Sequence, residues 1–370
     1  MDAMSPFFNA SFGNPSSVHR FGQIAESAIV SARETVSRVL NCSPDEIIFT
    51  SCGSESDNLA IRGAAYAMRE KTGAKWILAS RAEHPAVTMT LRHLERYEGF
   101  LIEWLDVDER GMVTPEIVSK AICDNTAVVS VMYANNEIGT INSINKIAEI
   151  CRANNILFHT DAVQAAAYLP VDVTELGVNM MSLGAHKFYG PKGVGALYVR
   201  KGTPLVPQLT GGGQEFNLRA GTQNVPYIVG FGEALRLAHE EREQRSAHVK
   251  PLRDKIIGTV LETIVDSRLT GDIEFRLPHH ASFVFKDVDG NLLLTLLDAA
   301  GFACSSGSAC KTGNPEPSEV MNAIGLSREW GLGSLRVTLG KDITREGVES
   351  FLVALPRLVE KVRALKQSIF

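Results

Sequence analysis

Three short segments combine residue types that could together hold and activate one small molecule. The segment TSCGSESDN, residues 50–58, joins an expected strand to a helix start through Gly53 and Ser54. Free backbone N–H groups and the helix dipole at such a junction attract an anion such as a phosphate. Ser54 could instead serve only as the cap of the helix, so this segment alone leaves both interpretations open.

Asp161 and Lys187 follow later strands of the same region. The segment HTDAVQ, residues 159–164, places Asp161 at an expected strand end, although a capping role explains this residue better when it is taken alone. Lys187 follows an apolar strand and precedes a Gly/Pro-rich turn, where a desolvated ammonium has a lowered pKa and can form a Schiff base. Lys192 is the rival, but we expect it to be solvated within GPKG. An ordinary surface lysine remains the alternative for both.

An anion site, a carboxylate and a lysine at the strand ends of one sheet suit pyridoxal phosphate. This cofactor needs a cradle for its phosphate, a carboxylate that keeps its pyridine nitrogen protonated, and a lysine that binds its aldehyde. Lys187 follows Asp161 by 26 residues, on the next expected strand. The combination is more specific than any of its parts.

Two later residues suggest a nucleophile and a carboxylate-binding group. Cys310 lies in GFACSSGSACKTGNPEP, residues 301–317, whose Gly and Ser content predicts a mobile loop. A thiol on an exposed loop is a candidate nucleophile, although a bystander cysteine fits the composition too; Cys304 is expected to be a buried or a spectator thiol. Arg336 interrupts an apolar strand, where a substrate carboxylate or a structural ion pair would satisfy it.

Apolar runs alternate with helical patterns over the first 225 residues. The expected strands are 46–50, 76–80, 101–106, 127–133, 156–160, 179–183 and 195–199, and the helices are 55–71, 85–97, 115–123 and 144–154. This order predicts a parallel sheet covered on both faces, which binds ligands beyond the carboxyl ends of its strands. A helical region to about 264 then leads to a smaller α+β unit, with strands 281–286 and 334–339 and helices 290–300 and 344–368.

The composition excludes several classes of protein. The chain has 370 residues, a net charge of −5, 45% hydrophobic and 21% charged residues, which is an ordinary globular balance. No apolar run approaches the roughly 20 residues that span a bilayer, and the N-terminus is not a secretory signal. Six cysteines are too few for a disulfide scaffold. We expect a cytoplasmic enzyme without a membrane segment or a direct nucleic-acid partner.

The sequence resembles the NifS/IscS-like cysteine desulfurases, within the class-V aminotransferase family of fold-type I pyridoxal-phosphate enzymes. The matching motifs are FGNPSSVHRFG (12–22), FTSCGSESDNLAIRG (49–63), EHPAV (83–87), YANNEIGT (133–140), HTDAVQ (159–164), AHKFYGPKGVGAL (185–197), GGGQE (211–215), RAGTQN (219–224), SSGSAC (305–310) and EPSEV (316–320). The last two are the most diagnostic. The resemblance implies a large, mainly parallel α/β domain of residues 13–245. It also implies a small α+β domain of residues 1–12 and 246–370 that carries the cysteine loop.

The resemblance implies a role for each matched residue around the cofactor ring. Lys187 would bind pyridoxal 5′-phosphate covalently, and Asp161 would pair with its pyridinium nitrogen. Gln164 would donate a hydrogen bond to the ring hydroxyl, and His84 would stack on the ring and help to move protons.

Further matched residues would hold the phosphate and the substrate. Gly53, Ser54 and His186 would bind the phosphate together with Thr222 of the other subunit, so that a homodimer is part of the mechanism. Asn135, which also contacts the cofactor, and Arg336 would hold the carboxylate of L-cysteine.

Cys310 would be the nucleophile that takes the sulfur as a persulfide and passes it to an acceptor such as an iron–sulfur scaffold, for cluster or thio-cofactor assembly. The one metal role expected is a transient iron–sulfur ligand at Cys310, shared with such a scaffold. A selenocysteine lyase, or another cysteine lyase of the same fold, is the alternative activity.

Two departures from the family pattern affect these expectations. Members usually begin with a strand and turn reading YLDNAATT, whereas this chain opens at MDAMSPFF. Loss of that element would weaken folding and activity and would leave a catalytically weak scaffold. A serine that contacts the phosphate usually stands three residues before the lysine, where this chain has Gly184, so we expect weaker retention of the cofactor.

Overall fold

The computed structural model describes residues 1–307 and 316–367 and divides into two compact units. The larger unit comprises Met1–Leu105, Thr114–Tyr133 and Ser143–Arg242, and the smaller unit comprises Asp106–Val113, Ala134–Asn142 and Glu243–Phe370. This division differs from the sequence expectation in two respects. Residues 1–12 belong to the larger unit, and two short insertions from within the first 150 residues belong to the smaller one.

A seven-stranded sheet forms the centre of the larger unit within the described residues, in the order β1-β7-β6-β5-β4-β2-β3. The strands are β1 (Ile47–Thr50), β2 (Trp76–Ser80), β3 (Leu101–Leu105), β4 (Thr126–Ser130), β5 (Leu157–Asp161), β6 (Met180–Gly184) and β7 (Gly195–Val199). Strands β2 to β6 pair in parallel, and β7 is antiparallel to both of its neighbours. The expected mainly parallel α/β fold is confirmed.

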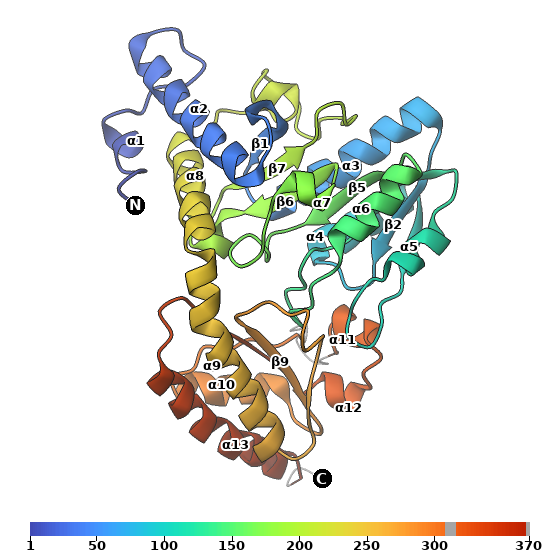
Figure 1. Cartoon of the computed structure of the whole chain (residues 1–370), viewed down its shortest axis with the longest axis vertical. Helices are drawn as coiled ribbons and strands as arrows, with labels where there is room; N and C mark the ends of the chain where they lie inside the picture. The colour runs from blue at the N-terminus through green and yellow to red at the C-terminus, as the bar shows by residue number, and fades with distance from the viewer. Residues whose placement is uncertain (308–315, 368–370) are drawn as a thin grey trace. The chain divides into compact units, whose positions relative to one another are not determined.

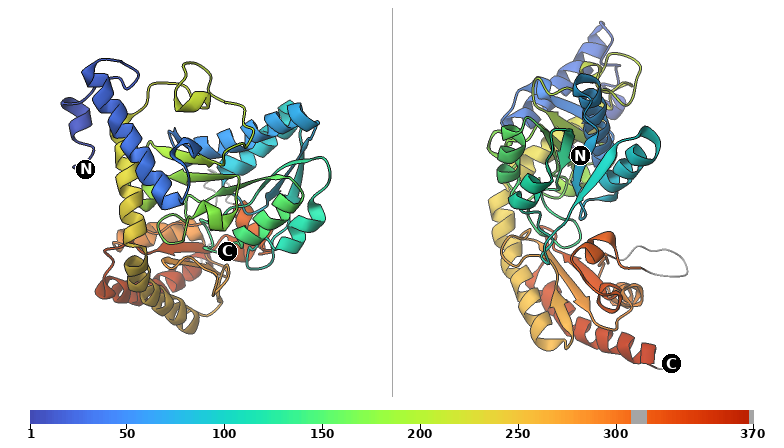
Figure 2. Two further views of the ribbon diagram at one scale, coloured as in Figure 1. Left: turned by 45° about the horizontal axis from the view of Figure 1, so that its top comes forward. Right: turned by 90° about the vertical axis from the view of Figure 1, so that its right-hand side faces the viewer.

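Helices cover this sheet (Figure 1). They are α1 (Pro6–Asn9), α2 (Arg20–Leu40), α3 (Gly53–Thr72), α4 (Pro85–Glu98), α5 (Pro115–Ala121), α6 (Ile144–Ala153), α7 (Val173–Leu176) and α8 (Val225–Glu240). Helix α2, which the sequence analysis did not predict, packs along α8 (Figures 1 and 2).

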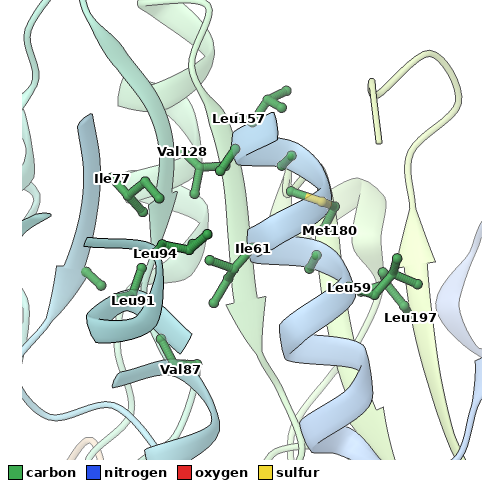
Figure 3. Packing of buried hydrophobic residues seen from close by; sticks show 14 of the residues in the cluster. Leu59, Ile61, Ile77, Val87, Leu91, Leu94, Val128, Leu157, Met180 and Leu197 are labelled. Atoms are coloured by element: carbon green, nitrogen blue, oxygen red, sulfur yellow. The ribbon is translucent and has the colours of Figure 1, made fainter. Parts of the chain in front are cut away.

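Buried side chains of α3 and α4 pack on the sheet in one cluster (Figure 3). Leu59 and Ile61 come from α3, and they meet Val128 and Met180 of the strands. Burying a side chain of this size contributes about 1.5–3 kcal/mol, so this contact holds the first turn of α3 at the end of β1.

The smaller unit contains a three-stranded antiparallel sheet in the order β10-β9-β8 within the described residues. Its strands are β8 (Ser267–Leu269), β9 (His280–Phe285) and β10 (Ser334–Thr338), and its helices are α9 (Arg242–Thr263), α10 (Gly290–Ala299), α11 (Glu319–Ala323), α12 (Arg328–Gly331) and α13 (Arg345–Gln367). Helices α10 and α13 pack together, and α13 leads to the C-terminus (Figure 2). None of the described helices has the length and apolarity needed to cross a membrane.

Candidate active site

The carboxyl ends of three strands meet at one edge of the large sheet. Asp161 ends β5, and Gly184 ends the neighbouring parallel strand β6. Thr50 of β1 and Gly184 both pair with Gly195 of β7, which lies between their strands. The start of α3 is therefore brought beside the end of β6, where ligands bind in sheets of this kind.

The first turn of α3 forms an anion cradle at this edge. The N–H groups of Gly53 and Ser54 lie in the first turn, where no intrahelical acceptor exists, and the residue that precedes the helix, Cys52, makes no side-chain cap. A Cβ placed on Gly184 would lie 3.6 Å from the Gly53 nitrogen and 3.6 Å from Cε1 of His186. The predicted phosphate-binding residues are thus close together, and their backbone donors suit a phosphate.

Asp161 and His84 lie together beside this cradle. Burial raises the pKa of Asp161 to about 6, against the effects of the Val163 N–H and the Lys187 charge. Oδ1 of Asp161 accepts the Val163 N–H at 2.9 Å. His84 precedes α4, and its Nδ1 accepts the Ala86 N–H at 3.1 Å, so the proton of the neutral ring is at Nε2. Burial and then Lys187 lower the pKa of His84 and keep it neutral.

Lys187 lies on the single 3-10 turn Ala185–Phe188 that follows β6, and the residue is exposed, so the expected desolvation of its ammonium is not observed. Its charge acts on Asp161, His84 and His186, which places the ammonium within electrostatic reach of all three. Gln164 is half-buried just beyond Asp161, and Thr222 is exposed in a loop. Their roles stay predictions.

A second buried acid in this site was not predicted. One ligand atom of Asp57, one of His84 and one of Asp161 all lie within 4.8 Å of one another. Asp57 comes from α3, and its carboxyl is 3.6 Å from Nε2 of His159 on β5. The sequence offered little signal, because an aspartate near a helix start ordinarily interacts favourably with the helix dipole and with water.

The smaller unit carries the expected carboxylate-binding residues. Arg336 lies on β10, and its Nη1 donates to the Asn136 carbonyl at 2.8 Å. Among the described residues, no carboxylate lies within ion-pair distance of its guanidinium, so the structural ion pair considered as an alternative is not present there. Burial lowers the pKa of Arg336, and Glu137 opposes this effect. The adjacent Asn135 shapes its turn, because its Oδ1 accepts the N–H groups of Glu137 and Ile138.

Cys310 lies outside the described residues, and hydrogen bonds hold the residues on either side of this gap. Ser305 pairs with Arg336 through backbone hydrogen bonds, and the Gly307 N–H donates to Ser334 Oγ at 3.1 Å. At the other end, Ser318 Oγ donates to Glu137 Oε2 at 2.5 Å. Cys304 is half-buried, and burial raises its pKa to about 11, which agrees with the expected spectator role.

Comparison with known proteins now identifies the family. The sequence model described as aminotransferase class-V matches residues 1–351. The chain belongs to this family. It is 46% identical to the cysteine desulfurase IscS of Dictyoglomus turgidum over 364 residues, which are 98% of this chain and 92% of that protein. It is 45% identical to the IscS of Methanosarcina thermophila, covering 98% of this chain and 89% of that one.

Solved structures of similar proteins share the fold. A structure described as a NifS-like protein superimposes with a TM-score of 0.90 at 36% identity, covering 97% of this chain and 95% of that chain. A second, described as SspA in complex with cysteine, gives a TM-score of 0.78 at 34% identity and covers 91% and 94% of the two chains. The predicted fold-type I architecture is thereby confirmed.

The residues at the sheet edge fit pyridoxal phosphate. The cradle at Gly53 suits its phosphate, buried Asp161 suits a ring nitrogen that carries a proton, and Lys187 supplies an amine. Asp57 and Asp161 together also suit a ring nitrogen that carries a proton. Two buried carboxylates this close repel each other, and a bound cation would reduce that repulsion.

Proposed function

We propose that the chain is a pyridoxal-phosphate-dependent cysteine desulfurase, which converts L-cysteine to L-alanine and passes the sulfur to an acceptor protein. The observation that carries the proposal is the grouping of the α3 cradle, Asp161, His84 and Lys187 at one sheet edge. Family membership and relatives named cysteine desulfurase support the same activity.

The chain's own residues would hold the cofactor and a proton on it. Pyridoxal phosphate would supply the electron sink that permits cleavage of a bond next to an amino-acid carbon. Lys187 would hold it covalently, and Asp161 would keep the proton on its ring nitrogen, because a buried carboxylate is stabilised by an adjacent cation. His84 is neutral, so its imidazole ring is suited to stacking on the cofactor ring. Its Nε2 is suited to exchanging a proton with the substrate.

Substrate binding and sulfur transfer would use the smaller unit. Arg336, with Asn135, would bind the carboxylate of L-cysteine through parallel hydrogen bonds. The Cys310 thiolate would attack the substrate sulfur, so that an S–S bond forms while the C–S bond breaks and its electron pair stays with the carbon. Protonation of that carbon gives alanine, and the sulfur remains on Cys310 as a persulfide.

Sulfur acceptors and a second subunit complete the proposal. Cys310 would pass its sulfur to an acceptor such as an iron–sulfur scaffold or a thio-cofactor relay. A homodimer would bring Thr222 of one subunit to the phosphate of the other. We place this reaction in the cytoplasm.

Borohydride reduction of the holoenzyme tests the cofactor site. Peptide mapping should then find a pyridoxyl group on Lys187, and Lys187→Ala should lose that group. A folded, cofactor-supplemented protein with no label on residue 187 would contradict the proposal.

A second variant tests the sulfur step separately. Cys310→Ala should keep the label on Lys187 but release alanine from L-cysteine roughly a thousandfold more slowly, as expected when a nucleophile is removed. A selenocysteine lyase would behave differently. Its Cys310→Ala variant would release alanine from selenocysteine as fast as the unaltered enzyme does, and the unaltered enzyme would release little alanine from cysteine.

A further inference from the structure

The loop of residues 209–224, which leads into α8, contains three consecutive residues with left-handed backbone. Glu215, Phe216 and Asn217 have φ values of +44°, +57° and +64°, and none of them is glycine. Residues with a Cβ rarely adopt this conformation, because the Cβ crowds the following carbonyl oxygen. Such a run persists only where the surrounding structure holds it. Thr222 lies later on the same loop, so these contacts bear on the residue proposed to reach the phosphate.

Glu215 supplies contacts of this kind through a buried carboxylate. Its Oε1 accepts hydrogen bonds from Arg33 Nη2 at 2.8 Å and from Gln223 Nε2 at 2.5 Å. Its Oε2 accepts from Arg33 Nη1 at 2.9 Å and from the Phe49 N–H at 2.8 Å. Arg33 belongs to α2, Phe49 to β1 and Gln223 to the loop itself. Four donors satisfy both oxygens, and they join the loop to two other elements.

The pair of Arg33 and Glu215 is buried among aromatic rings. The Arg33 guanidinium lies 4.8 Å from the centroid of the Phe49 ring and 5.1 Å from that of Phe216. It also donates to the Ile47 carbonyl. A bidentate ion pair with cation–π contacts holds a guanidinium in one geometry. The position of Glu215 is therefore set by buried contacts.

Hydrogen bonds hold the residues on both sides of Thr222. The Gly221 N–H donates to Gln214 Oε1 at 3.0 Å, and the Gln223 amide donates to Glu215. Thr222 itself is exposed. Its backbone is thus fixed from both sides, while the residue stays accessible to a ligand.

A second ion pair ties the loop to the anion cradle. Arg219 Nε donates to Glu55 Oε1 at 2.8 Å, and Glu55 lies in the first turn of α3. The other oxygen of Glu55 accepts the Ser51 N–H at 2.7 Å. The loop 209–224 is therefore built against β1, α2 and the start of α3 within a single chain.

We propose that Glu215 and Gln223 are positioning residues for the cofactor phosphate, because their hydrogen bond fixes Thr222 in place before the phosphate binds. This inference rests on the proposed function and deepens it, since both residues act through Thr222. A donor that is already ordered loses less conformational freedom when its ligand arrives. The expected benefit is slower loss of the cofactor.

Gln223→Met is the sharpest variant for a test. It keeps the approximate length of the side chain and removes the donor. Both hydrogen bonds between Arg33 and Glu215 remain, so no buried charge loses its partner, as it would in Glu215→Gln. Gln208→Met is the matched control, because the Gln208 amide donates to the Val206 carbonyl and not to Glu215.

Dissociation of the cofactor is measured on the holoenzyme by trapping free pyridoxal phosphate after dilution. We expect dissociation roughly tenfold faster in Thr222→Ala, about threefold faster in Gln223→Met and unchanged in Gln208→Met. The double variant Thr222→Ala/Gln223→Met should lose the cofactor no faster than Thr222→Ala alone, because Gln223 acts through Thr222.

The outcomes separate this inference from the proposed function. Effects that multiply to roughly thirtyfold in the double variant would show that Gln223 acts independently of Thr222, and would overturn the inference alone. Unchanged dissociation in Gln223→Met would do the same. Unchanged dissociation in Thr222→Ala would remove the proposed phosphate contact of Thr222, and the inference with it.

Hydrogen exchange of the apo-protein tests the positioning without the cofactor. Amides of residues 209–224 should exchange at least about threefold faster in Gln223→Met than in the parent, and amides of α8 should keep the parent rate. Equal rates in the loop would show that Gln223 does not hold it and would overturn the proposal. Faster exchange throughout the larger unit would indicate general destabilisation and would contradict it equally.

Discussion

At Gly184 a single missing hydroxyl separates this chain from the pattern that its family usually shows. The residue ends β6 with extended backbone. A Cβ there would lie 3.5 Å from Val163 Cγ1 and 3.6 Å from the Gly53 nitrogen. Both are ordinary van der Waals contacts, so the site accepts a small side chain without rearrangement.

Gly184→Ser should therefore improve retention of the cofactor. Its hydroxyl would add one hydrogen bond to a charged phosphate, worth about 1.5 kcal/mol, which corresponds to roughly tenfold slower dissociation. Dissociation is measured by trapping free pyridoxal phosphate after dilution. Gly184→Ala is the matched control, because it adds the Cβ without the donor; equal dissociation from the two variants would count against the phosphate assignment.

Among the elements, the turn 134–142 organises the part of the smaller unit that holds Arg336. The Asn136 carbonyl accepts from Arg336 and also lies 3.3 Å from Nε2 of His280 on β9. Gly139 has φ +78°, and a Cβ there would lie 2.7 Å from Nδ1 of His280. The backbone of the turn is thus in close contact with the ring that it helps to position.

Gly139→Ala should destabilise the protein and raise KM for L-cysteine. The strained φ costs about 1 kcal/mol, and the clash with His280 brings the total loss in unfolding free energy to about 2–3 kcal/mol. Gly325→Ala is the control, because Gly325 has φ +77° and open space around it. Urea unfolding and KM distinguish the two; equal losses for both variants would show that the contact with His280 does not matter.

Most strands could be predicted because each is a continuous apolar run, which the sheet buries on both faces. The antiparallel direction of β7 follows from its short link, since residues 185–194 leave no room for a crossover helix. Asp161 and Lys187 were predicted from their places after strands. Asp57 was not, because its neighbours His159 and Ser182 come from two other strands and only folding brings them together.

For the molecule as a whole, buried histidines make stability depend on pH. The pKa of His159 is about 3 in the folded protein and about 6.5 in an unfolded chain. Between these two pH values the unfolded chain binds a proton at His159, and the folded protein does not. This contribution is present above pH 6.5 and is lost as the pH falls from about 6.5 towards 3. Asp57 and Glu83, with raised pKa values, act in the opposite sense.

The comparison between parent and His159→Gln isolates one proton from these opposing effects. As the pH falls from about 6 to 4, the unfolding free energy of the parent should decrease more steeply than that of the variant. The two slopes should differ by up to about 1.4 kcal/mol per pH unit. Urea unfolding of the two apo-proteins at several pH values gives both slopes. Parallel curves would mean that His159 is charged when folded.

The proposed homodimer can be tested by complementation between subunits. If Thr222 binds the phosphate of the other subunit, a mixed dimer of Lys187→Ala and Thr222→Ala contains one site with neither defect. The cofactor affinity of that site should equal that of the parent enzyme. If Thr222 acts within its own subunit, the site that keeps Lys187 lacks Thr222, and its affinity should match that of Thr222→Ala alone.

The division of the chain into two units constrains how its gene can be rearranged. The polypeptide passes between the units after residues 105, 113, 133, 142 and 242. A gene cut after codon 242 would leave both insertions of the smaller unit on the first fragment, so neither fragment would encode that unit completely. A single exchanged segment of the gene therefore cannot replace the whole smaller unit.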